Sequence, residues 1–96
     1  MKSRRPDLRK LASGRQCMVR IPAVCNHDPS TTVLAHVSGG GMGRKSSDLA
    51  GAWCCSACHD VIDGRVTTPV TRDVVKLWHL EGVVRTLEAL EREGVL

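Results

Sequence analysis

The sequence predicts a small α+β domain that needs a covalent or metal staple and that ends in a long helix. Apolar residues make up 42% of its 96 residues, but aromatic residues make up only 2%. A core without Phe or Tyr is thin, and small domains of this kind usually add disulfides or a metal. Five cysteines and four histidines are available for that purpose. A β-branched run over 31–37 and a helical pattern over 71–93 supply the two kinds of secondary structure.

Several classes of protein are excluded by the same sequence. No apolar run approaches the roughly 20 residues that a membrane-spanning helix needs. The basic residues 1–10 are not followed by the apolar stretch of a secretory signal, so a cytoplasmic location is expected. In such a chain, closely spaced cysteines in odd number favour metal binding over a disulfide scaffold.

The charge is unevenly distributed along the chain. Residues 1–20 carry seven basic side chains and one acidic one, a net charge of +6, whereas residues 21–96 carry a net charge of −2. We therefore predict one domain in three segments: a basic arm (1–14), a metal-bound core (15–66) and a C-terminal packing helix (67–96). The arm suits contacts with phosphates, although a solvated tail has the same composition. The predicted phosphate contacts, which include two cations of a glycine-rich loop, are Arg4, Arg5, Arg9, Lys10, Arg15, Arg44 and Lys45.

The elements follow in order from local patterns. We expect a helical turn at 7–12 that ends at Gly14, an irregular loop over 15–30, a strand over 31–37 and a glycine-rich loop over 38–47. A short returning strand falls within 48–53. A short helix over 55–63 ends at Gly64.

The C-terminal pattern predicts one helix over 71–93, with Thr71 as its N-cap and Gly94 as its stop. Its four basic and five acidic side chains argue against a basic recognition helix. We expect its apolar residues to form one stripe that packs on the core or forms a homodimer seam, with His79 off the stripe at the surface. The members of the stripe are Val74, Leu77, Trp78, Leu80, Val84, Leu87 and Leu90.

Four of the cysteines are spaced as metal ligands. Cys17 and Cys25 form a loose first pair, and Cys55 and Cys58 form a C-x-x-C pair that leads into a helix. Four thiolates complete the tetrahedron of a closed structural zinc site. Cys54 gives a poorer spacing and is predicted to be a free thiol. The alternatives are five buried, unligated cysteines or a redox C-x-x-C, and the chain lacks the βαβ context of the latter.

The histidines are then available for a second, open site. His59 and Asp63 lie four residues apart on the predicted helix, so one divalent ion could bind both and keep open positions. His36, on the predicted strand, could take a proton from water beside that ion. The alternative for His36 is a hydrogen-bonded core histidine. His27 is expected in a surface turn.

The order of these residues resembles the HNH, or ββα-metal, endonucleases. It consists of the strand residue His36, a glycine loop, Asp48-Leu49 and Cys55-x-x-Cys58-His59. A closer similarity extends to the small prophage-encoded nucleases typified by YbcO. The phrases that carry it are Asp7-Leu8-Arg9-Lys10, Gly14-Arg15-Gln16-Cys17, Val19-Arg20-Ile21-Pro22, Val24-Cys25-Asn26, Leu34-Ala35-His36 and Cys55-Ser56-Ala57-Cys58-His59-Asp60.

The resemblance implies a zinc-stapled ββα-metal core and hydrolysis of DNA, duplex or branched, in a bacterium or a phage-infected host. His36 matches the general base of the family, and His59 matches the ligand of a catalytic Mg²⁺ or another divalent ion. Asp48 stands where the family has Asn, and we expect this catalytic residue either to hold the ring N–H of His36 or to join the metal shell. Ala35 stands where many members have a further ligand. The alternative function is a non-catalytic zinc-finger module that binds nucleic acid or protein.

Overall fold

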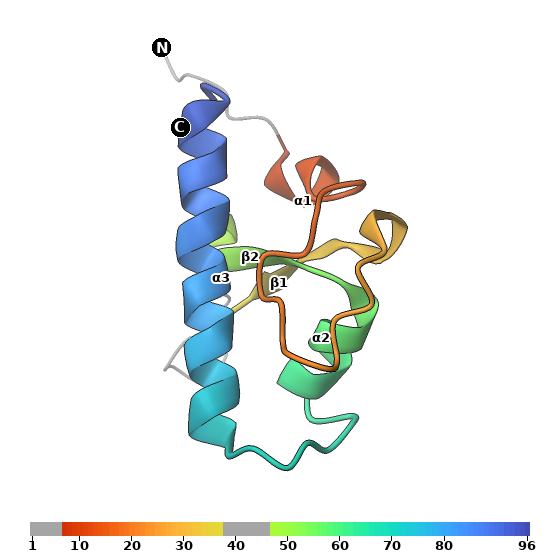
Figure 1. Ribbon diagram of the computed structural model, residues 1–96. Coiled ribbons are helices and arrows are strands. Elements are labelled where there is room, and N and C mark those ends of the chain that lie inside the picture. Colours follow the sequence, from red (N-terminus) through yellow and green to blue (C-terminus); the bar gives the residue numbers. More distant parts are fainter. Residues whose placement is uncertain (1–6, 38–46) are drawn as a thin grey trace.

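The computed structural model describes residues 7–37 and 47–96. These described residues form two strands and three α-helices in the order α1 (Leu8–Leu11), β1 (Val33–His36), β2 (Gly51–Cys54), α2 (Ser56–Ile62) and α3 (Arg72–Arg92). Two 3₁₀ turns, η1 (Pro29–Thr31) and η2 (Asp48–Ala50), precede the strands. The predicted α+β class with a long C-terminal helix is confirmed, and α3 runs along the whole length of the molecule (Figure 1).

The two strands pair in an antiparallel sheet. The register places Val33 opposite Cys54 and His36 opposite Gly51. All four residues of β2 are buried, whereas β1 alternates in exposure. β2 then leads directly into α2, whose N-cap is Cys55. The helix ends before Gly64, which adopts a left-handed backbone conformation. His36 is the last residue of β1, and His59 lies on α2, the helix that follows the sheet.

Helix α3 packs against β2 through small and polar residues. Thr86 Oγ1 accepts the N–H of Trp53 at 3.0 Å and donates to the carbonyl of Gly82 at 2.8 Å. Gly82 permits this close packing, because a Cβ there would lie 2.8 Å from Val19 Cγ2 and 3.1 Å from the Val19 Cα. The glycine that weakens the helix by propensity is therefore required by the approach of the helix to the core.

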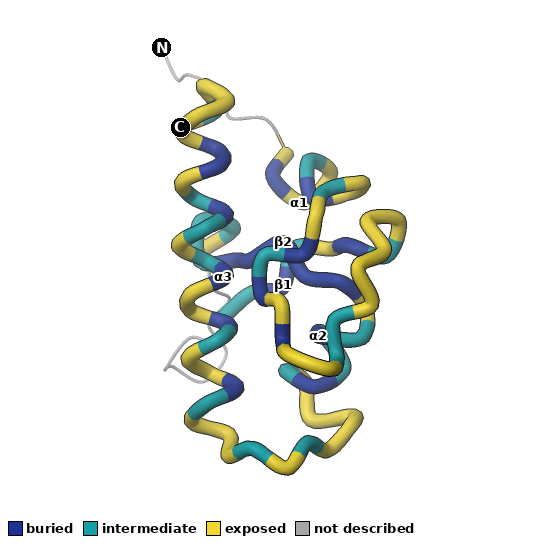
Figure 2. Tube along the Cα trace, in the orientation of Figure 1, coloured by how far each residue is buried: buried dark blue, intermediate teal, exposed yellow. Residues whose placement is uncertain are grey.

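The buried face of α3 is not the predicted one. The structure buries Val75, His79, Gly82, Thr86, Ala89 and Leu90. The predictions that Leu77, Leu80 and Val84 face the core and that His79 lies at the surface are wrong, since these apolar side chains are exposed and His79 is only 5% exposed. Figure 2 shows that buried positions alternate with exposed ones along α3. The helix selects side chains that fit a close contact, so size and hydrogen bonding outweigh hydropathy here.

Part of the predicted basic arm belongs to the folded body. Asp7 caps α1 through its side chain, and Leu8 and Ala12 are buried in a cluster with Trp53, Ala89 and Leu90. A second cluster surrounds the cysteines. The two small clusters, on either side of β2, replace the single aromatic core that the composition lacks. Within the described residues, no helix is long and apolar enough to cross a membrane.

Candidate metal centre and catalytic cavity

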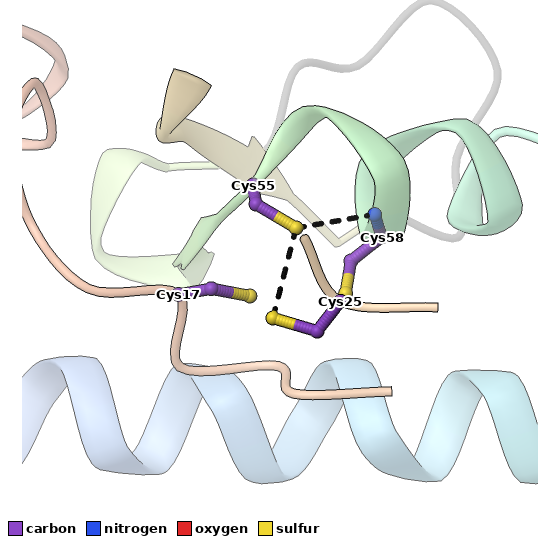
Figure 3. A group of neighbouring side chains, drawn as sticks. All are labelled: Cys17, Cys25, Cys55 and Cys58. Carbon is purple, nitrogen blue, oxygen red and sulfur yellow. Dashed lines mark hydrogen bonds between the residues drawn. The ribbon is translucent and has the colours of Figure 1, made fainter. Parts of the chain in front are cut away.

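The four predicted zinc ligands converge. The sulfur atoms of Cys17, Cys25, Cys55 and Cys58 all lie within 4.8 Å of one another. Cys55 and Cys58 come from the start of α2, and Cys17 and Cys25 come from the N-terminal loop that wraps around it (Figure 3). The Sγ atoms of Cys25 and Cys55 are 3.8 Å apart. Four sulfurs at this separation fit the tetrahedral shell of Zn²⁺, in which Zn–S distances are about 2.3 Å.

Backbone N–H groups near these cysteines point at their sulfur atoms. The N–H of Arg20 points at Cys17 Sγ at 3.4 Å, and the N–H of Cys58 points at Cys55 Sγ at 3.4 Å. Such donors stabilise thiolate charge. Three non-glycine residues of the loop, Arg20, Ala23 and His27, adopt positive φ values of 54° to 62°. Each such residue costs on the order of 1 kcal/mol, so the loop needs the cluster to hold its shape.

The fifth cysteine, Cys54, is not a member of the four-sulfur group. Cys54 is fully buried, and the sulfurs of Cys17 and Cys58 raise the pKa of its thiol far above the usual range. Its assignment as a free thiol stays a prediction. Burial also raises the pKa of Cys25 to about 11. A divalent cation would offset the cost of gathering thiolates here.

A second group of side chains lies at the end of β1. His36 Nε2, at the end of β1, is 2.7 Å from Asp48 Oδ1, in the turn η2 that precedes β2. Both side chains are partly exposed. The contact lowers the pKa of the Asp48 carboxyl, with the nearby charge of Arg9 adding to the effect. The carboxylate can only accept, so Nε2 carries the hydrogen and Nδ1 is left with a lone pair when the ring is neutral.

The predicted ligand pair lies on α2. His59 Nε2 is 3.3 Å from Asp63 Oδ2, one helical turn away, and each side chain is about one third exposed. Arg65 Nη2 also contacts Asp63 Oδ2 at 3.3 Å, and its Nη1 contacts Asp60 at 3.2 Å. An imidazole nitrogen and a carboxylate oxygen on one helix face are suitable ligands for a divalent ion. In the structure the exposed Arg65 is a partner of the Asp63 carboxylate.

A cavity of about 590 Å³ lies between α2, α3 and the end of β1. Its walls include His36, Asp63 and the basic side chains of Arg65, Arg72 and Lys76. Arg72 donates to the carbonyls of Val61 at 2.7 Å and Ile62 at 2.5 Å, which joins α3 to the end of α2. The cavity walls therefore combine histidines, carboxylates and cations, and such a combination is suited to a phosphate ester.

One residue of the cavity wall was not predicted from the sequence. His79 lines the cavity from the buried face of α3 and contacts the carbonyl of Ala35 through Nε2 at 2.8 Å. The available signal was spacing: Val75, His79, Gly82, Thr86 and Ala89 recur at alternating intervals of four and three residues. Hydropathy hid that stripe because two of its members are polar and one is glycine.

The predicted phosphate contacts are placed only in part. Arg4, Arg5, Arg44 and Lys45 lie outside the described residues. Arg9 Nε contacts Asp48 at 3.4 Å, so this exposed cation lies beside the His36 pair, and Lys10 is exposed on the same short helix. Arg15 instead pairs with Glu93 and stacks over Trp53, 4.7 Å from the ring centroid. Its guanidinium joins the start of the chain to the end of α3.

The fold and the cluster define a small α+β protein with four cysteines that could hold a metal ion and with a separate cavity lined by basic side chains. Residues 6–95 match the model of the family described as "Putative nuclease YbcO". The chain belongs to this family, which is named for nuclease activity. The earlier resemblance to this phage-associated family is confirmed.

Two curated relatives have the same degree of similarity. "Putative nuclease YbcO" of Escherichia coli (strain K12) and "Putative nuclease ybcO" of Enterobacteria phage 82 are each 50% identical over 93 residues, covering 94% of this chain and 96% of theirs. A solved structure, described as that of a putative bacteriophage protein from Escherichia coli str. K-12 substr. MG1655, superposes with a TM-score of 0.78 at 49% identity. It covers 92% of this chain and 100% of the other.

Proposed function

We propose that the protein is a metal-dependent, HNH-type endonuclease that hydrolyses phosphodiester bonds of duplex or branched DNA. The observation that carries this proposal is the 2.7 Å contact between His36 Nε2 and Asp48 Oδ1 beside a cavity lined by Asp63 and three cations. The nuclease name of the family supports it. The succession of β1, β2 and α2, with a histidine on β1 and another on α2, is the order of the ββα-metal unit.

In this proposal His36 is the general base. Asp48 holds the ring by accepting the Nε2 hydrogen and stabilises the imidazolium that forms when Nδ1 takes a proton from water. The oxygen of that water forms a bond to phosphorus, and the bond from phosphorus to the 3′-oxygen breaks. The aspartate in place of the family's asparagine is suited to this task, because a carboxylate favours the charged ring more than an amide does.

The metal ions have separate roles. Cys17, Cys25, Cys55 and Cys58 would hold a structural Zn²⁺, because their sulfurs already form a closed four-ligand set. His59 and Asp63 would hold Mg²⁺ or another divalent cation on one face of α2. When bound there, that cation stabilises negative charge on the phosphoryl and leaving oxygens.

The substrate backbone is proposed to lie along the basic residues beside this cavity. Arg9 and Lys10 flank the His36 pair, and Arg4, Arg5, Arg44 and Lys45 would extend the contacts from outside the described residues. Such phosphate contacts position the duplex and carry no base preference. With only two tryptophans in the chain, stacking on single-stranded bases is disfavoured as a mode of recognition.

Nicking of supercoiled plasmid in Mg²⁺ or Mn²⁺ tests this function. The wild-type protein should nick, and His36→Ala should lose roughly 10²–10⁴-fold in rate, the usual contribution of a general base. His27→Asn is the histidine control, because His27 is exposed and asparagine tolerates its positive φ. Its zinc content is checked first, because His27 Nδ1 lies 3.7 Å from Cys25 Sγ. Equal traces of nicking by wild type and His36→Ala would instead favour the non-catalytic zinc-finger module.

A further inference from the structure

His79 is a buried histidine with one ring nitrogen in use. It lies in the second turn of α3 and is 5% exposed. Its Nε2 is 2.8 Å from the carbonyl oxygen of Ala35, the residue before His36. A carbonyl only accepts hydrogen bonds, so Nε2 carries the hydrogen and the neutral ring has its lone pair on Nδ1. Within the described part of the chain, Nδ1 has no hydrogen-bond partner.

The cavity around His79 contains Asp63, a proposed cation ligand, together with the basic side chains of Arg65, Arg72 and Lys76. The ring lines the 590 Å³ cavity together with His36 and Asp63. The charged and titratable groups that act on it are His36, His59 and Asp63, all members of the proposed catalytic group. Burial lowers the pKa of His79, which keeps the lone pair available at neutral pH. Histidines that serve metal sites commonly donate one ring N–H to a backbone carbonyl in this way.

We propose that Nδ1 of His79 accepts a hydrogen bond from a water in the hydration shell of the divalent cation held by His59 and Asp63. This inference rests on the proposed function, in that it needs their cation site. The contact is through water, because His59, Asp63 and His79 do not form a converging group of three ligands; among the described residues only the four cysteines form such a group. Mg²⁺ keeps several of its waters when protein-bound, so an outer acceptor of this kind fits its chemistry.

Two substitutions separate the two ring nitrogens. In His79→Gln the side-chain amide N–H can still reach the Ala35 carbonyl, but the acceptor at Nδ1 is lost. In His79→Asn the amide oxygen lies near the Nδ1 position, but the side chain is too short for Ala35. The fold of each variant is checked by its zinc content and thermal unfolding.

The readout is Mn²⁺ affinity, measured by electron paramagnetic resonance on the zinc-loaded protein without nucleic acid. We expect the Mn²⁺ dissociation constant to rise roughly 10–100-fold in His79→Gln, the usual effect of losing an outer-shell partner. His79→Asn should stay near the wild-type affinity even though it unfolds at a lower temperature.

Two results would overturn the inference in distinguishable ways. If His59→Ala abolishes Mn²⁺ binding but His79→Gln binds as wild type does, His79 only supports the backbone of Ala35, and the cation site itself stands. If the wild-type protein binds no Mn²⁺ at the His59 and Asp63 pair, the proposed catalytic site fails together with this inference.

Discussion

The four-cysteine cluster and the cavity lined by His36 and His79 both include residues at α2, yet they differ in the kind of side chains, in burial and in access for water. The cluster gathers four ligand atoms of one kind within 4.8 Å, and three of its four cysteines are buried. The cavity gathers histidines, carboxylates and cations around an open volume of about 590 Å³. His36 and Asp63, which line it, and His59, which contacts Asp63, each remain about 30% exposed. A closed set of ligands excludes water and substrate, whereas an open one admits both.

The difference teaches how a chain with so little aromatic core positions an open candidate site. Cys55 caps α2 and Cys58 lies in its first turn, while His59 and Asp63 lie on the next face of the same helix. Fixing the first turn of α2 therefore also fixes the histidine beside it. Substitutions in each region test whether folding and activity depend on different residues.

The largest effect is expected from the cluster. Cys58→Ser should abolish zinc binding and folding, because structural zinc contributes roughly 10–16 kcal/mol in apparent binding free energy and small domains are stable by only about 5–15 kcal/mol. Metal analysis and circular dichroism check this. Cys54→Ala, at the neighbouring thiol outside the cluster, should keep about one zinc per chain. Loss of zinc in Cys54→Ala would show that the ligand assignment is wrong.

A large effect on activity alone is expected at Asp48. Asp48→Asn should lower the plasmid-nicking rate by roughly 10²-fold, since the amide supports a charged His36 ring less well. Zinc content and melting temperature should stay unchanged, because Asp48 is partly exposed and outside the cluster. If the rate is unchanged and only stability falls, the pair is a structural contact.

A moderate effect on stability is expected where α3 meets both regions. Gly82→Ala gains about 1 kcal/mol in helix propensity but places a methyl group against Val19, and overpacking of this kind costs about 1–3 kcal/mol. We expect net destabilisation in urea unfolding, with zinc stoichiometry retained. Val84→Ala, at an exposed position of the same helix, should change stability by less than about 0.5 kcal/mol. A stabilised Gly82→Ala would contradict the close contact.

A smaller effect is expected from pH. Burial lowers the pKa of His79 below its ordinary value of 6.5, so the unfolded chain binds the proton more tightly than the folded one. This group's contribution to stability is fully present above pH 6.5 and is lost as the pH falls through its folded pKa, by at most about 1.4 kcal/mol per pH unit. Urea unfolding between pH 7.5 and 5.5 should show the decrease, and His79→Gln should reduce it. An unchanged pH dependence in His79→Gln would assign it to other groups.

The smallest effect on the fold is expected at the exposed apolar row of α3. Leu77, Leu80 and Val84 are 53%, 44% and 56% exposed, and the predicted homodimer seam remains a proposal for this row. If two copies pair there, Val84→Lys should convert a dimer into a monomer in sedimentation velocity, with melting temperature and zinc content near wild type. A wild-type protein that sediments as a monomer at all concentrations would refute the seam.

Much of the local structure could be read from short-range patterns. Thr71 and Gly94 bound α3 as predicted, and Gly64 follows α2 in a left-handed conformation as its C-terminal stop. The convergence of Cys17, Cys25, Cys55 and Cys58 also followed from spacing, because a C-x-x-C at a helix start leaves few places for the partner ligands. Caps, stops and ligand pairs depend on neighbours within a few residues, so the sequence carries them directly.

The orientation of α3, the burial of His79 and the content of the cavity were decided only by tertiary structure. Hydropathy favoured Leu77 and Val84 for the core, but the helix turns toward the sheet the face on which Gly82 allows the closest approach and Thr86 satisfies the N–H of Trp53. Contacts between residues such as His79 and Ala35, 44 positions apart, depend on that packing. The sequence by itself determined the elements and the four cysteines that converge; the close packing of α3 on β2 decided which polar groups line the cavity.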